Sequence, residues 1–97
     1  MTFIQIIEAR TENLDGILAL DDDWAEATEG KRTARRSIVT TDRNDPTRHL
    51  VIVFFDDYES AMKNSALPET QTFAERWAKL VDEPPAFRDL DVIADRS

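Results

Sequence analysis

The run His49–Phe55 is the feature that most restricts what this chain can fold into. Six of its seven residues are apolar. Val, Ile and Phe favour an extended backbone, and the run is too short for an independent helix. An unbroken apolar run indicates a strand that is buried on both faces. Helices of the same chain can cover one face only, so the sequence predicts a second cover for the other, and we expect it to be a second copy of the protein.

The rest of the chain predicts an alternation of strands and helices around this run. In chain order we expect a strand at Phe3–Ala9, a helix at Leu14–Thr28, strands at Ser37–Thr41 and His49–Phe55, helices at Tyr58–Ser65 and Glu69–Val81, and a strand at Phe87–Ala94. A turn at Asp42–Arg48 joins the second and third strands into a hairpin. Right-handed crossovers convert this order into a ferredoxin-like βαββαβ fold of the α+β class. Its four-stranded antiparallel sheet has the strand order 4-1-3-2.

Composition excludes several classes of protein. The 97 residues suit a single domain over the whole chain, 1–97. The net charge of −8 argues against binding to nucleic acids and to anionic membrane surfaces. The chain has no cysteine, so it has no disulfide, thiolate metal site or cysteine nucleophile. No apolar stretch is long enough to span a bilayer and no signal peptide is visible, so we expect a cytoplasmic protein.

Three stretches resemble a known family. They are the opening strand Phe3–Ala9 that leads into an Asn-capped helix, the strand end Phe54-Phe55-Asp56, and the helix–Pro–helix segment Tyr58–Phe73. Together they resemble the antibiotic-biosynthesis-monooxygenase-like (ABM-like) group of the dimeric α+β barrel superfamily. The resemblance implies a homodimer formed through the helix-free sheet face, with a cavity between sheet and helices in each subunit.

The same resemblance implies a range of activities. Some relatives oxidise aromatic polyketides or quinols without metal or flavin, some degrade haem, and many have no known activity. The haem-degrading relatives use a histidine on the second helical segment, and Tyr58–Val81 contains none. The resemblance therefore implies a cofactor-free protein with a small aromatic ligand.

His49 is the only histidine and the candidate catalytic base, because the pKa of histidine lies near working pH. The alternative is a strand-end histidine bonded to the neighbouring turn. A single His and no Cys also argue against a metal site.

The candidate substrate-binding residues are Trp24, Trp77, Phe55, Tyr58 and Arg36. The two tryptophans lie on the apolar stripes of their helices, where they could line a cavity or simply pack in the core. An arginine at the start of the second strand could hold an anionic or phenolate oxygen, or could be an exposed charge.

Asp21-Asp22-Asp23 has the carboxylates of a hard-cation site, but three adjacent helical residues point in three directions. The run is therefore interpreted as a solvated face.

Two functions remain open. The chain is either a cofactor-independent monooxygenase for a small aromatic or quinol-type substrate, or a non-catalytic homodimeric ligand-binding or accessory domain. A structural subunit that pairs through an edge strand is a third reading.

Overall fold

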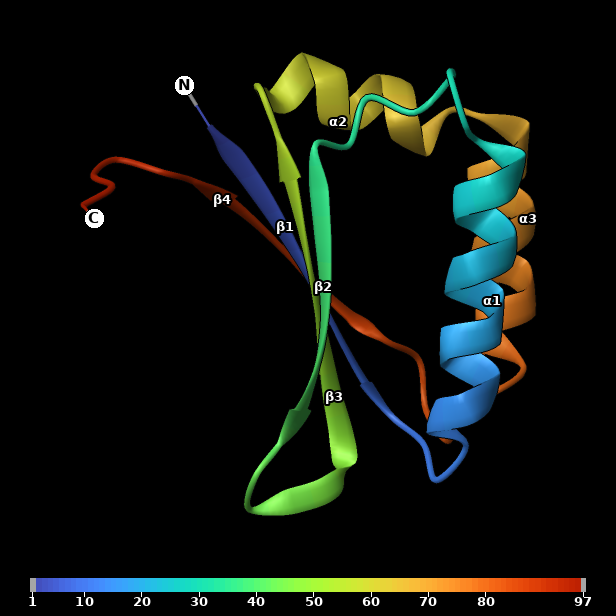
Figure 1. Cartoon of the computed structure of the whole chain (residues 1–97). Helices are drawn as coiled ribbons and strands as arrows, with labels where there is room; N and C mark the ends of the chain where they lie inside the picture. Colours follow the sequence, from blue (N-terminus) through green and yellow to red (C-terminus); the bar gives the residue numbers. More distant parts are fainter. Residues whose placement is uncertain (1, 97) are drawn as a thin grey trace.

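The computed structural model describes residues 2–96 and contains four strands and three helices (Figure 1). The elements are β1 (Phe3–Arg10), α1 (Leu14–Ala27), β2 (Arg36–Asp42), β3 (Asp45–Phe55), α2 (Tyr58–Ser65), α3 (Pro68–Ala78) and β4 (Ala86–Asp91). The strands form one antiparallel sheet in the order β2-β3-β1-β4, and the helices lie on one side of it. The predicted fold and strand order are confirmed.

Alternating side chains of the two central strands point to opposite faces of the sheet. Strands β1 and β3 are aligned so that Phe3 pairs with Phe55 and Ile6 pairs with Ile52. The helix-covered face contributes the buried residues Phe3, Ala9, Val51, Val53 and Phe55 to the core. Ile17 and Leu20 of α1, Ala61 of α2 and Trp77 of α3 complete that core. This alternation follows from the two-residue period of a strand.

The helix-free face, which we call the open face, is also largely apolar. Its central residues are Ile4, Ile6, Ile38, Leu50, Ile52 and Phe54, all of them half-buried, with the exposed Leu90 beside them on β4. The two-sided apolar character that the run His49–Phe55 predicts is therefore present in the sheet.

Charged side chains form a hydrogen-bonded network across one end of the open face. Glu8 accepts hydrogen bonds from Arg48 at 2.8 Å and from Arg88 at 3.1 Å, and Arg48 also donates to Asp42 at 2.8 Å. Arg48 and Arg88 together hold the pKa of Glu8 below its usual value. The open face thus has an apolar centre and a paired ionic border.

The helix starts follow the local sequence. Asn13 caps α1 by accepting a hydrogen bond from the Gly16 backbone N–H at 3.0 Å, and Asp57 caps α2 in the same way through Ser60 N–H at 2.7 Å. Proline opens α3, where its missing N–H needs no partner. Helix α1 ends one residue before the predicted end, and α3 ends at Ala78 rather than at Val81.

The hairpin differs from the prediction in where its third strand starts. Strand β3 begins at Asp45, inside the segment predicted as a turn, so that only residues 43 and 44 form the turn. The pairing register shifts between Thr41, which pairs with His49, and Asp42, which pairs with Asp45. This irregularity leaves residues 46–48 of β3 without partners on β2. Strand β4 ends at Asp91, before the predicted Ala94.

No helix within residues 2–96 has both the length and the apolar character that crossing a membrane requires.

Candidate functional site

A cavity of about 210 Å³ lies between the helix-covered face of the sheet and helices α1 and α3. Five aromatic residues contribute to its wall: Trp24, Phe55, Phe73, Trp77 and Phe87. Neutral polar residues contribute as well, among them Gln5, Ser37, Asn64, Thr70 and Gln71. The cavity is the kind of concave, mostly apolar space with a few polar groups that small molecules occupy.

The two tryptophans that the sequence places on helix stripes both line this cavity. Trp24 on α1 donates its Nε1–H to Thr70 Oγ1 on α3 at 2.9 Å. Its ring lies 6.0 Å from the ring of Phe73, which in turn stacks on Trp77 at 6.3 Å and 28°. The hydrogen bond and the ring contacts together fix the aromatic wall where α1 meets α3.

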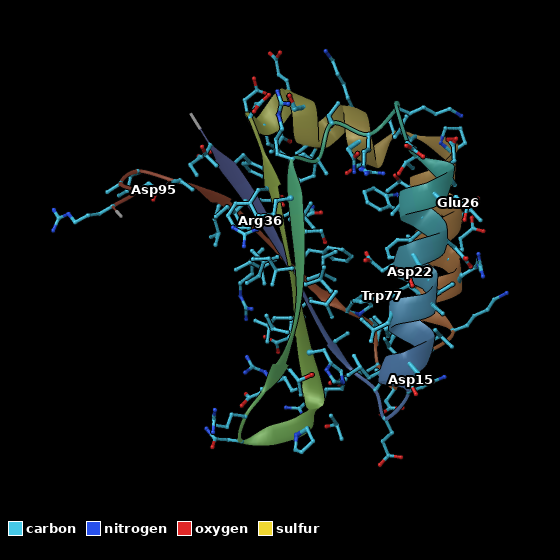
Figure 2. The ribbon with its side chains drawn as sticks, viewed as in Figure 1. Asp15, Asp22, Glu26, Arg36, Trp77 and Asp95 are labelled. Atoms are coloured by element: carbon cyan, nitrogen blue, oxygen red, sulfur yellow. The ribbon has the colours of Figure 1, made fainter. Side chains whose placement is uncertain are left out.

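Trp77 carries a polar group without a partner. Its side chain is only 3% exposed and faces the sheet from α3 (Figure 2). Within residues 2–96, Nε1 of this indole is the one buried side-chain nitrogen or oxygen that makes no hydrogen bond. Because an unsatisfied buried donor is unfavourable, an acceptor on a bound molecule would stabilise this part of the wall.

Asp21 is the one ionisable side chain in the cavity wall. It is half-buried, and burial raises the pKa of its carboxyl group above the usual value. The negative charge of Asp22 raises this pKa further, whereas Arg32 opposes the shift. Asp21 is therefore a carboxyl group with a raised pKa that lines the aromatic cavity.

Asp21 is not among the site residues that the sequence predicts. The interpretation of Asp21-Asp22-Asp23 as a solvated face holds for Asp22 and Asp23 only, which are exposed. The signal was present in the helical period, because Asp21 follows Ile17 by four residues and precedes Trp24 by three. An acidic residue in phase with the apolar stripe was the pattern to notice.

His49 lies outside the cavity wall. Its ring is 2% exposed, with Nε2 3.2 Å from the Thr11 carbonyl oxygen and Nδ1 2.9 Å from Thr41 Oγ1. A carbonyl only accepts hydrogen bonds, so Nε2 carries the hydrogen of this pair. Both ring nitrogens bind the protein itself, and the position matches the structural alternative for this residue.

Tyr58 and Arg36 do not line the cavity either. Tyr58 is 54% exposed, and its ring packs edge-on against Phe3 with centroids 5.5 Å apart. Arg36 lies on the open face, where its guanidinium carbon is 5.8 Å from the centre of the Phe54 ring (Figure 2). The site therefore unites Trp24, Trp77 and Phe55, and leaves out His49, Tyr58 and Arg36.

No group of three His, Cys, Asp or Glu side chains in the described part of the chain is placed to hold a metal ion.

Comparison with known proteins identifies the fold. No protein-family model and no curated protein matches the chain. Rv0793 from Mycobacterium tuberculosis matches with a TM-score of 0.81 at 12% identity, over 100% of both chains. A variant of SnoaB, a cofactor-independent oxygenase from Streptomyces nogalater, matches with a TM-score of 0.82 at 9% identity, over 97% of this chain and 95% of that one. A candidate antibiotic biosynthesis monooxygenase from Chloroflexus aurantiacus matches with a TM-score of 0.75 at 17% identity, over 100% and 98%.

At identities this low the likeness shows the fold alone. The chain has the ABM-like fold, as the sequence resemblance implies.

Proposed function

We propose that this protein is a cofactor-independent monooxygenase for a small aromatic or quinol-type substrate, with Asp21 as the base. One observation carries the proposal: a cavity of about 210 Å³ has an aromatic wall and a single ionisable side chain, Asp21. The name of SnoaB, an oxygenase without cofactor on the same fold, supports the reaction class.

The proposed reaction requires only a binding surface, a base and a hydrogen-bond donor from the protein. A neutral hydroxyarene would lie against the aromatic wall, and the Asp21 carboxylate would take the proton of its hydroxyl group. A raised pKa suits this role, because a base works best when its pKa lies close to the working pH. The unpartnered N–H of Trp77 would donate to the oxygen that becomes negative.

The electron-rich anion then reacts with molecular oxygen at a ring carbon. For an anthrone, the base takes a proton from the ring CH₂ carbon, which gives an anion of the same kind, and one oxygen atom of O₂ forms the new carbonyl at that carbon. The other oxygen atom leaves as water with the two hydrogens of that carbon. The substrate is oxidised and O₂ is the oxidant, so the reaction requires no further reductant.

Oxygen uptake with an anthrone or a hydroquinone tests the proposal. We expect Asp21→Asn to lower the rate by about 100-fold or more, which is the usual contribution of a general base. Asp22→Asn is the matched control, because Asp22 is the exposed neighbour on the same helix. It should keep turnover and move the acidic limb of the pH profile to lower pH, since Asp22 raises the pKa of Asp21.

Equal rates for the wild type and Asp21→Asn would exclude Asp21 as the base. If the wild type binds these aromatic compounds without consuming oxygen, the protein is the non-catalytic ligand-binding domain instead.

We further propose that residues 1–97 form one domain that pairs as a homodimer through the open face. The apolar centre of this face, with Ile6 and Ile52 aligned in the middle, is what supports the pairing. A monomer would leave these side chains against water, and pairing two such faces removes them from it.

A further inference from the structure

One acidic side chain of the cavity wall, Asp21, has no ion-pair partner in the described part of the chain. Within residues 2–96, no Lys, Arg or His contributes to the cavity wall. On the same helix, Asp23 is paired with Arg76 at 3.2 Å, whereas Asp15, Asp22 and Glu26 are exposed to solvent. Asp21 differs from them because it is half-buried and lines the cavity.

We propose that the cavity selects its ligands by charge, and that it binds small aromatic ammonium ions more tightly than neutral or carboxylate compounds of the same shape. The inference rests on the same cavity as the proposed function and concerns binding alone. It does not require that any oxygen chemistry takes place.

Arg32 is the cation whose charge lowers the pKa of Asp21, but its own donors bind other groups. Its Nη1 donates to the Ala25 carbonyl oxygen at 2.6 Å and to Thr28 Oγ1 at 3.4 Å. Its guanidinium carbon lies 5.8 Å from the centre of the Trp24 ring. Arg32 therefore lowers the pKa of Asp21 in part without pairing with it, and this pKa stays above its usual value.

An ammonium group on a ligand would complete the missing pair. It would form a charge-assisted hydrogen bond with the Asp21 carboxylate, and such bonds are roughly twice as strong as neutral ones. A carboxylate on the ligand would instead bring a second negative charge into a half-buried space, which is unfavourable.

The aromatic wall favours the same ligand class. The faces of Trp and Phe rings carry negative potential, and they attract a cation that approaches within about 6 Å of the ring centre. Asp21 and Trp24 are three residues apart on α1, so both lie on the helix side that meets the cavity. A ligand ammonium on Asp21 would have aromatic rings around it.

The volume suits a small aromatic ligand. A cavity of about 150 Å³ in an apolar protein core holds one benzene molecule. The cavity here has about 210 Å³ and has room for two fused rings carrying a short aminoalkyl group. Because such an ion would occupy the carboxylate that the proposed reaction needs, aromatic ammonium ions should also inhibit turnover of neutral substrates competitively.

Three naphthalene compounds of similar shape separate charge from shape: 2-naphthylmethylammonium, 2-naphthylmethanol and 2-naphthoate. Isothermal titration at pH 7 would measure their dissociation constants with wild type, Asp21→Asn and Asp22→Asn. We expect the ammonium to bind at least about tenfold more tightly than the alcohol, a difference of about 1.4 kcal/mol, and the carboxylate to bind weakest.

The variants identify the source of the preference. Asp21→Asn should bind the ammonium and the alcohol about equally, whereas Asp22→Asn should keep the preference. If the preference persists in Asp21→Asn, it comes from the overall net charge of −8 and the inference is wrong. Equal affinities of the wild type for ammonium and alcohol, or no binding of any compound, would also overturn it.

A pH series with the wild type gives the same answer without relying on the folding of a variant. The ratio of the two affinities should fall towards one as the pH is lowered through the pKa of Asp21, and a constant ratio contradicts the inference. A charge preference without oxygen uptake would support the inference and reject the proposed oxygenase. Oxygen uptake without a charge preference would do the reverse.

Discussion

Replacing His49 by alanine should destabilise the protein and leave the cavity chemistry intact. The imidazole makes two hydrogen bonds, to the Thr11 carbonyl oxygen and to Thr41 Oγ1, from a position that is 2% exposed. Each bond contributes about 1 kcal/mol, and the void left by the ring adds about 1 kcal/mol or more. We therefore expect the free energy of unfolding to fall by roughly 3 kcal/mol, which lowers Tm by about 12 °C or more in a domain of this size.

Urea unfolding followed by the fluorescence of the two tryptophans measures this loss. Protein concentration must be the same for all variants, because self-association would add to the apparent stability. Thr41→Val is the matched control, since Thr41 is exposed and the change removes only one of the two bonds, for a loss of about 1 kcal/mol. The folded His49→Ala protein should consume oxygen at the wild-type rate per molecule. A variant of normal stability that has lost turnover would restore His49 as the base and refute this reasoning.

Three other predictions test an ion pair at the hairpin, a helix start and the open face. Arg10 of β1 forms an ion pair with Asp45 at the start of β3. This pair, together with hydrogen bonds from Thr47, lowers the pKa of Asp45 from the usual 3.8 to about 2, so its contribution to stability is complete above about pH 4 and is lost as the pH falls to about 2. Arg10→Met should accordingly be less stable than wild type at pH 6 and closer to it at pH 2.5 in urea titrations. Gly16→Ala should not raise Tm, although alanine favours helices by about 1 kcal/mol. Its Cβ would lie 2.7 Å from the capping amide, and a lost cap costs about as much. A gain of several degrees would show that the cap survives. Ile52→Asp should sediment as a particle of 11.1 kDa where wild type sediments as a dimer. Ile93→Asp, at a position 92% exposed, should not change the assembly. A monomeric wild type would reject the pairing.

The fold could be predicted because the strongest signals in this sequence are local. The apolar runs indicate β1 and β3 as central strands, and capping residue types such as Asn13 and Asp57 indicate where helices begin to within a residue or two. The order of elements then leaves few topologies, since crossovers are right-handed. The start of β3 was missed because Asp45 and Pro46 are typical turn residues, yet here they lie in an extended segment beside an irregular hairpin.

The site was harder to predict because it depends on which side of an element a residue faces and on what its neighbours already bind. Residue type made His49 the natural base, but only the structure shows both of its nitrogens in use. Residue type also made Asp21 one of three similar acids, although burial and the cavity set it apart. The side of the helix on which Trp24 and Trp77 lie could be predicted, because the apolar stripe of each helix has to face the sheet.

The weakness of β4 has a consequence for access to the interior. All six of its residues are exposed, and its one neighbouring strand is β1. Phe87 in this strand and Pro85 just before it nevertheless belong to the cavity wall. Peripheral segments of this kind detach locally at a small fraction of the free energy of global unfolding. Transient release of β4 would therefore remove Phe87 from the cavity wall and widen the opening of the cavity, while the core between β1, β3 and the helices stays packed. Amide hydrogen exchange should be fastest along this strand.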